Sequence, residues 1–167
     1  MNMLEFTEAE MADGLCWRLT ASVSGLRAID FDLSRPPQGQ RNDHNHFLLE
    51  AVRQLRGYFA GILRRFDLGL DMQGTDFQKR VWNELQSIAF GETRSYSQVA
   101  AAIGAPRAVR AVGAANGANP VPIVVPCHRV IGASGKLVGY GGGLALKQRL
   151  LELEGIDVGR HAKTAAR

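Results

Sequence analysis

The segment PCHRV, residues 126–130, carries the residue types that cysteine chemistry needs. Cys127 supplies a thiol, and His128 and Arg129 follow it with a base and a positive charge. A thiolate is the reactive form of cysteine, and a neighbouring base or cation favours it. The apolar run IVV, 123–125, predicts a short strand that ends at Cys127. Because neighbouring strand residues point to opposite sides, we expect His128 to act on the thiol through a water molecule.

A helix is predicted in LALKQRLLELEG, residues 144–155, with two charges on its apolar side. Lys147 and Glu154 lie about 10 Å apart along such a helix, too far to pair with each other, so each needs a partner elsewhere. Two partners are open for Glu154: His128, which it would orient, or an arginine in an ordinary salt bridge. The apolar arc itself consists of leucines, namely Leu144, Leu146, Leu150, Leu151 and Leu153.

Two short helices and a turn precede the cysteine segment and must help to position it. Capping boxes formed by Thr75 with Gln78 and by Ser95 with Gln98 begin helices at 76 and 96. Gly104 is expected to end the second of these, and Pro106 to be the first residue of a third helix, 106–116. The pattern predicts a helix-turn-helix, although many helical hairpins never touch DNA.

The two faces of the helix 106–116 differ in a way that indicates a binding surface. Helical spacing turns Val109, Val112 and Asn116 inward. Small side chains between arginines allow the helix backbone to approach a narrow groove. A helix that recognises bases in the major groove would present more Asn or Gln side chains to the base edges. We therefore expect docking in the minor groove of DNA without sequence specificity. The outward face consists of Arg107, Arg110, Ala111 and Ala114.

The N-terminal part predicts a small sheet with one helix and carries no chemical motif. Strands are expected at 15–23 and 26–31, joined through Ser24 and Gly25, with a third strand at 66–72. An amphipathic helix is expected at 46–63. Three residues of this part can ligate metals in principle, but their spacing and the lack of a second nearby cysteine argue against a metal site. These residues are Cys16, His44 and His46.

Composition places the chain among globular proteins of one compact or two small domains. Its 167 residues are 46% apolar and 22% charged, which argues against disorder. The net charge of +4 is uneven: residues 92–167 carry ten basic and four acidic residues, and residues 1–91 carry ten and twelve. This basic C-terminal half favours a polyanionic partner. No apolar run approaches the ~18 residues that cross a membrane, and the acidic start is unlike a signal peptide, so we expect a cytoplasmic protein. The two cysteines are far apart in the sequence and form no disulfide or zinc pattern, so we expect free thiols.

Residues 74–155 resemble the C-terminal domain of the O6-alkylguanine-DNA alkyltransferases, also named methylated-DNA–protein-cysteine methyltransferases. The segments that carry the resemblance are FQKRVW, GETRSY, RAVGAANGANPVPIVVPCHRVIG, GYGGGLALK and LLELEG. The resemblance implies an α/β (α+β) fold of two domains. A small ribonuclease-H-like domain of sheet and helix is expected at 1–73. A mainly helical, winged-helix-like domain with the helix-turn-helix is expected at 74–167, with a flexible tail after about 156.

The same resemblance implies a suicide enzyme that reverses DNA alkylation directly. It would flip O6-alkylguanine, and also O4-alkylthymine, from the minor-groove side of double-stranded DNA. It would then move the alkyl group, such as methyl, irreversibly and stoichiometrically onto Cys127. No cofactor, no metal and no membrane is implied. The protein is expected to act as a monomer, with cooperative binding along DNA left open.

The resemblance also assigns roles to residues around the acceptor. Cys127 matches the alkyl acceptor, His128 its base through a water, and Glu154 the residue that completes this relay. Asn119 matches an asparagine that braces the turn before the cysteine, and Lys147 a lysine that supports the cysteine backbone.

Further matched positions concern DNA and the flipped base. Tyr96 matches a tyrosine that crowds the target phosphate and donates a proton or hydrogen bond to guanine N3, and Arg110 matches the arginine that fills the space left in the stack. Val130, Tyr140 and Gly141 are expected to wall the base pocket. The remaining residues expected at DNA are Gln78, Ser97, Arg107, Ala111 and Ala114.

Two positions of the chain depart from the pattern of the family that it resembles. Ala105 leaves the third helix without a side-chain cap, and Gly141 stands where some relatives have serine, which leaves tolerance for bulky alkyl groups open. The zinc ligands of certain relatives are not recognisable.

Three other functions compete with the alkyltransferase interpretation. A non-catalytic lesion sensor would lack the cysteine, and a sequence-specific regulator would need a dimerisation segment. In a cysteine hydrolase, the cysteine would begin a helix and its histidine would be distant in sequence.

Overall fold

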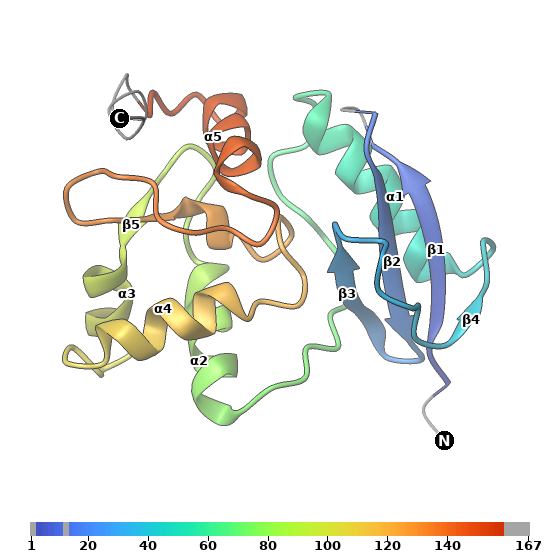
Figure 1. The fold of residues 1–167 in the computed structure, drawn as a ribbon, viewed down its shortest axis with the longest axis horizontal. Helices are drawn as coiled ribbons and strands as arrows, with labels where there is room; N and C mark the ends of the chain where they lie inside the picture. The colour runs from blue at the N-terminus through green and yellow to red at the C-terminus, as the bar shows by residue number, and fades with distance from the viewer. Residues whose placement is uncertain (1–2, 12–13, 159–167) are drawn as a thin grey trace. The chain divides into compact units, whose positions relative to one another are not determined.

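The computed structural model of the chain describes residues 3–11 and 14–158. The chain forms two compact units, and the predicted mixed α/β class is confirmed. The first unit comprises Met1–Gln73 and Pro120–Val124, and the second comprises Gly74–Asn119 and Val125–Arg167. Each unit holds a sheet and at least one helix (Figure 1). The tail predicted after about 156 lies mostly outside the described residues.

The sheet of the first unit has four strands in the order β3-β2-β1-β4. The predicted hairpin is confirmed: β2 (Cys16–Ser22) pairs antiparallel with β3 (Gly25–Asp30). On the other side of β2, β1 (Glu5–Glu10) pairs antiparallel with it, and the short β4 (Gln40–Arg41) runs parallel to β1.

The strand β1 was not predicted, because its sequence EFTEAE is acidic and alternates poorly. The structure gives its carboxylates partners on neighbouring segments. Glu8 lies opposite Arg18 in the register, and Arg18 Nε donates to Glu8 Oε1 over 2.9 Å. Asn45 Nδ2 donates to Glu5 Oε2 over 2.6 Å. Pairing with cross-strand and loop donors therefore lets an acidic segment lie inside a sheet.

The third strand expected at 66–72 is wrong, because pairing there is confined to one bridge between Leu26 and Leu70. Leu26 N donates to Gly69 O and Asp71 N donates to Leu26 O, over 2.8 and 2.9 Å. The Asp71 side chain instead accepts from Ser22 Oγ and from the Arg27 guanidinium. These side-chain bonds anchor the segment without extending the ladder.

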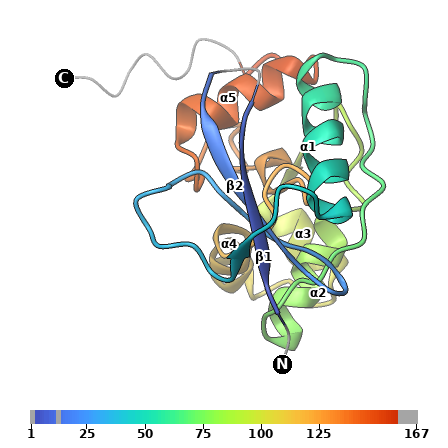
Figure 2. The same ribbon diagram turned by 90° about the vertical axis from the view of Figure 1, so that its right-hand side faces the viewer.

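The helix α1 (His46–Phe59) covers one face of this sheet, where it contacts β1, β2 and β3 (Figures 1 and 2). Asn45 caps its N-terminus by accepting from Leu48 N. The helix begins where the sequence predicts but ends four residues before Leu63, because Gly61 turns the chain with φ +72°. Its core side is formed with large buried side chains, among them Trp17, Leu19, Leu48, Leu55 and Tyr58.

The second unit is built on three helices that contact one another: α2 (Asp76–Leu85), α3 (Tyr96–Ala102) and α4 (Val109–Gly117). Both predicted capping boxes are confirmed, at Thr75 for α2 and at Ser95 for α3. The indole of Trp82 packs in the core and donates from Nε1 to the carbonyl of Ala115 over 2.8 Å. This bond ties α2 to α4 and sets where the outer face of α4 points.

The predicted start of α4 at Pro106 is wrong, because the helix begins at Val109. Residues 105–108 form a turn instead, closed by Ala108 N donating to Ala105 O over 2.8 Å. Pro106 occupies the second position of this turn, which its restricted φ favours. No side chain caps α4, as the sequence predicts, but the residue at the cap position is Ala108 and not Ala105.

Candidate active site

Cys127 is the first residue of the short 3-10 helix η1 (Cys127–Arg129). The strand expected at 123–125 is wrong: Ile123 has φ +74° and the segment turns there. Directly after η1, β6 (Val130–Ile131) pairs in parallel with β5 (Arg94–Ser95), which leads into α3. This two-stranded pairing places the cysteine segment beside the first residue of α3, although 31 positions separate Tyr96 from Cys127.

The thiol of Cys127 is buried but not sealed, with 4% of the residue exposed. Burial raises the pKa of this thiol, because a thiolate loses hydration there. Three influences act the other way: a hydrogen bond from the Asn119 side chain, the charge of Lys147, and the backbone N–H groups of Cys127 and His128. The thiol is therefore protonated at rest, with donors already placed around the sulfur.

His128 and Glu154 form a fully buried pair, in which His128 Nε2 lies 2.7 Å from Glu154 Oε1. Both alternatives left open for Glu154 are realised at once, because Arg129 also binds it. Arg129 Nε donates to Oε2 over 2.8 Å and Nη2 to Oε1 over 3.0 Å. The backbone N–H of Gly91 donates to Oε2 over 3.2 Å. Four donor contacts therefore hold the carboxylate, as expected for an ionised group.

The pKa of His128 is lowered from its ordinary value of 6.5, mainly because burial penalises the imidazolium. The Glu154 carboxylate opposes this shift, while Arg129 and Lys147 add to it. The ring is therefore neutral at pH 7. Since an ionised Glu154 only accepts, the ring proton sits on Nε2, and a proton taken from the thiol would have to arrive at Nδ1.

Lys147 and Glu154 are both buried, as the sequence predicts, on α5 (Leu144–Leu153) and at its C-cap. Lys147 Nζ donates to Val130 O over 2.7 Å and to Val138 O over 2.9 Å. Burial lowers the pKa of Lys147 to about 8, so the group remains a cation at pH 7. The expected burial of Leu144 is wrong: this residue starts the helix and is 49% exposed.

Two asparagines from the end of α4 bind the cysteine segment. Asn119 Nδ2 donates to Val125 O over 2.8 Å, which closes the turn that contains Pro120 and Ile123. Asn116 Nδ2 reaches the carbonyl of Cys127 itself at 3.4 Å. Helical spacing predicts Asn116 on the inward face of this helix but assigns it no role. An amide within an apolar stripe is the signal that a buried partner exists.

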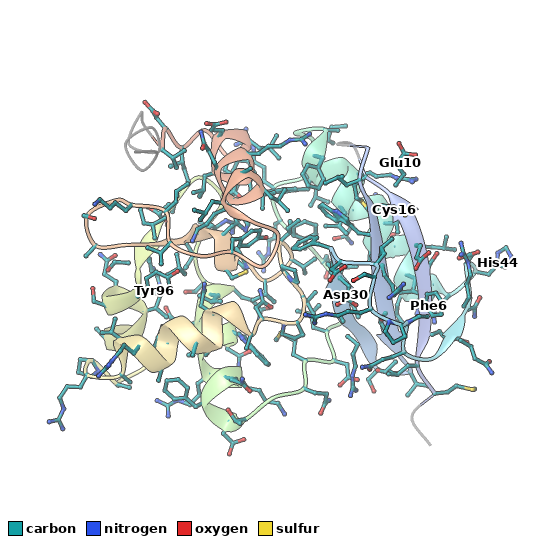
Figure 3. The ribbon with its side chains drawn as sticks, viewed as in Figure 1. Phe6, Glu10, Cys16, Asp30, His44 and Tyr96 are labelled. Carbon is teal, nitrogen blue, oxygen red and sulfur yellow. The ribbon has the colours of Figure 1, made fainter. Side chains whose placement is uncertain are left out.

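Tyr96, the first residue of α3, lies at the end of the segment that pairs with β6 (Figure 3). Its hydroxyl donates to the carbonyl of Val138 over 3.3 Å. Burial and the negative charge of a Cys127 thiolate both raise the pKa of Tyr96, so its hydroxyl stays protonated and can donate. The ring also lies close to α4, because a Cβ added at Gly113 would be 3.9 Å from it.

The outward face predicted for α4 is exposed, and Val112 and Asn116 are buried opposite it. Ser97 is exposed at the start of α3, where its hydroxyl lies 2.8 Å from that of Ser95. Gln78 is half-buried, and its side chain is engaged in the capping box of α2. The exposed residues of the predicted α4 face are Arg107, Arg110, Ala111 and Ala114.

The three residues expected around the base lie at different depths. Val130 is fully buried and offers its carbonyl to Lys147. Tyr140 is half-buried, and Gly141 is exposed with open space where a Cβ would stand. Lys147 thus connects the strand that follows the cysteine to the loop that carries Tyr140, since it also binds Val138.

Neither a metal cluster nor a membrane span is found in the described parts of the chain. Within residues 3–11 and 14–158, no three His, Cys, Asp or Glu side chains are grouped as metal ligands would be. Cys16 begins β2, whereas His44 lies in the loop before α1 (Figure 3). None of the helices within these residues is both long and apolar enough to cross a membrane.

The chain is similar to known proteins in both its sequence and its structure. A family model described as the DNA-binding domain of 6-O-methylguanine DNA methyltransferase matches residues 76–156. The chain is 67% identical over 132 residues to a methylated-DNA–protein-cysteine methyltransferase of Mycolicibacterium paratuberculosis, covering 79% of each protein. It is 58% identical to a protein of the same name from Methanosarcina acetivorans, over 82% of this chain and 90% of that protein.

Solved structures of Mycobacterium tuberculosis proteins give the same result. The O6-methylguanine methyltransferase of that organism superposes with a TM-score of 0.81 at 48% identity, covering 91% of this chain and 93% of the other. A crystal structure of the M. tuberculosis protein named OGT in complex with DNA superposes with a TM-score of 0.79, also at 48% identity, over 91% of this chain and 92% of the other.

Proposed function

Because this chain belongs to the family of methylated-DNA–protein-cysteine methyltransferases, we propose that it repairs O6-alkylguanine in DNA by taking the alkyl group onto Cys127. The observation that carries the assignment is the placement of Cys127 on η1, next to the buried pair of His128 and Glu154. A nucleophile, a base and an orienting acid are thus held on one short segment and one helix end.

The transfer is a displacement at the alkyl carbon. The thiol proton passes through a water to His128 Nδ1, and the Glu154 carboxylate stabilises the resulting imidazolium. The thiolate sulfur forms a bond to the alkyl carbon while the bond from that carbon to O6 breaks, and the electron pair leaves with guanine. The Tyr96 hydroxyl, which stays protonated in this environment, donates to N3 of the departing base. The thioether has no hydrolytic exit, so one molecule repairs one lesion.

Three further groups prepare the sulfur for this step. Asn119 binds Val125 O and lowers the pKa of the thiol. The Lys147 cation also lowers that pKa and binds the backbone on both sides of the site, at Val130 and Val138. The base would lie against the loop of Tyr140 and Gly141, next to Val130. O4-alkylthymine presents the same kind of alkyl carbon and is included as a substrate.

DNA is bound through the exposed face of α4 together with the start of α3. Its methyl-sized side chains, Ala111 and Ala114, allow the helix to enter the minor groove, where base readout is poor and binding has little sequence specificity. The lesion is inaccessible inside the duplex, so it is flipped out at a cost of a few kcal/mol. Arg110 takes the vacated place in the stack, Arg107 and Ser97 contact phosphates, and Gln78 supports them from α2. The protein works as a monomer.

The test uses a short duplex with one O6-methylguanine and mass analysis of peptides from the whole protein after incubation. We expect the mass of one added methylene unit on the peptide that contains Cys127, in a one-to-one ratio with repaired DNA. Cys16, which is exposed, is the matched control thiol and should stay unmodified. Cys127→Ser should bind the duplex and leave it methylated. Repaired DNA with an unmodified Cys127 peptide would exclude the mechanism, and binding without any repair would leave a lesion sensor.

A further inference from the structure

Arg129, two residues after Cys127, has a buried guanidinium that binds only groups next to the candidate active site. Its Nε and Nη2 pair with the two oxygens of Glu154, and its Nη1 donates to the carbonyl of Ile88 over 2.6 Å. The guanidinium carbon lies 6.0 Å from the ring centroid of Phe90. These contacts come from two places, the segment that follows α2 and the end of α5. Together they fix the orientation of the Arg129 guanidinium.

We propose that Arg129 is a positioning residue for the proton relay: its two-point pairing with Glu154 balances the carboxylate charge and so keeps the His128 ring neutral, with its proton on Nε2. This role rests on the proposed function, in which His128 takes the thiol proton. It assigns to Arg129 an action on the acceptor through two other side chains, without contact with the substrate.

Three charged side chains act on the His128 ring. Glu154 and Lys147 come from the end and the middle of α5, and Arg129 comes from η1. The neighbouring Cys127 thiol is uncharged at rest, because burial raises its pKa. A buried histidine bonded to an unbalanced carboxylate would gain a proton to form an ion pair, and an imidazolium cannot accept from a thiol. With Arg129 bound to the same carboxylate, the Arg129–Glu154 pair is already neutral. The ring then has no charge to balance.

The geometry also selects the tautomer. Oε1 of Glu154 is shared, because it accepts from His128 Nε2 over 2.7 Å and from Arg129 Nη2 over 3.0 Å. Oε2 accepts from Arg129 Nε and from Gly91 N. Arg129 thereby prevents the carboxylate from rotating away from Nε2. The position of the ring proton, and with it the accepting role of Nδ1, depends on this clamp.

The test compares the pH dependence of alkyl transfer in three variants of the full-length protein. Arg129→Met removes the charge and nearly keeps the length, Arg129→Lys keeps the charge, and Arg129→Met with Glu154→Gln removes both charges. In Arg129→Met, the midpoint of the acid limb of the rate should move up by about one pH unit or more, because an imidazolium is now favoured. In Arg129→Lys the midpoint should stay near the wild-type value while the rate falls. In the double variant the upward shift should disappear.

A merely structural role for Arg129 would lower the rate of Arg129→Met without moving the midpoint, and that result would overturn the proposal. If Arg129→Met does not fold, Arg129→Gln, which removes the charge but keeps a hydrogen-bond donor and leaves Glu154 in place, replaces it. In that variant, loss of the Arg129 charge should again move the midpoint up, and an unchanged midpoint would refute the idea.

A second readout needs no alkyl transfer and therefore separates this proposal from the proposed function. Nitrogen chemical shifts of the His128 ring in the wild-type protein at pH 7 should be those of a neutral ring protonated on Nε2. A doubly protonated ring, or a proton on Nδ1, would overturn the role of Arg129 even if Cys127 is methylated. A neutral Nε2-protonated ring in a protein that fails to repair DNA would instead contradict the proposed function alone.

Discussion

The substitution Glu154→Gln is predicted to destabilise the protein strongly, although it changes a single atom type and almost no volume. Glu154 has a side chain with 0% exposure, and Arg129, its partner, has 8%. Removing the carboxylate charge leaves the guanidinium buried without a counterion. Breaking one partner of a buried ion pair costs about 3–5 kcal/mol of unfolding free energy, because the remaining charge is uncompensated. For a chain of this size, that corresponds to a melting temperature lower by about 6–20 °C.

The assay is thermal and urea unfolding of the wild type, Glu154→Gln, Arg129→Met and the double variant. The two single substitutions should each be severe, and the double should cost clearly less than their sum, since it leaves no unpaired ion. Glu50→Gln is the matched control. Glu50 also binds an arginine at close range, Arg53 at 2.5 Å, but both side chains are exposed on α1, so no measurable loss is expected. Equal effects of Glu154→Gln and Glu50→Gln, or strict additivity in the double variant, would show that the buried Arg129–Glu154 pair does not stabilise the fold in this way.

Three further outcomes are expected. Arg110→Ala should slow repair of duplex DNA by at least tenfold more than reaction with a free O6-alkylguanine base, since only the duplex requires flipping; equal losses would contradict that role. Lys147→Met should slow iodoacetamide labelling of Cys127 at pH 7 by about an order of magnitude, because a cation that favours the thiolate is lost; an unchanged rate would exclude that influence. Below the ordinary histidine pKa of 6.5, the unfolded chain binds a proton at His128 that the folded protein does not, so the free energy of unfolding should fall as the pH drops. Urea titrations should show that His128→Asn flattens this pH dependence.

Local chemistry could be predicted wherever a residue acts within one or two turns of itself. The capping boxes at Thr75 and Ser95 and the turn at Gly104 are of this kind, and all three are confirmed. The inward orientation of Lys147 and Glu154 also follows from helical spacing alone. These features depend on near neighbours in the chain, which the sequence states directly.

Secondary structure was predicted wrongly where segments distant in the chain override a local preference. The apolar run at 123–125 looks like a strand, yet no neighbouring strand pairs with it, and the turn at Ile123 is held by Asn119. The acidic segment of β1 looks unsuited to a sheet, yet Arg18 across the register neutralises Glu8. Strand formation depends on partners, which periodicity cannot supply.

Residue order and helical spacing were enough to show that Cys127 is followed by a base and a cation, and that the final helix buries two charges which need outside partners. Residue order did not reveal that one carboxylate, Glu154, binds His128 and Arg129 together, or that β5 and β6 bring Tyr96 beside the cysteine segment. A buried charge requires a partner but does not specify which one. The choice is made by packing between segments far apart in the chain.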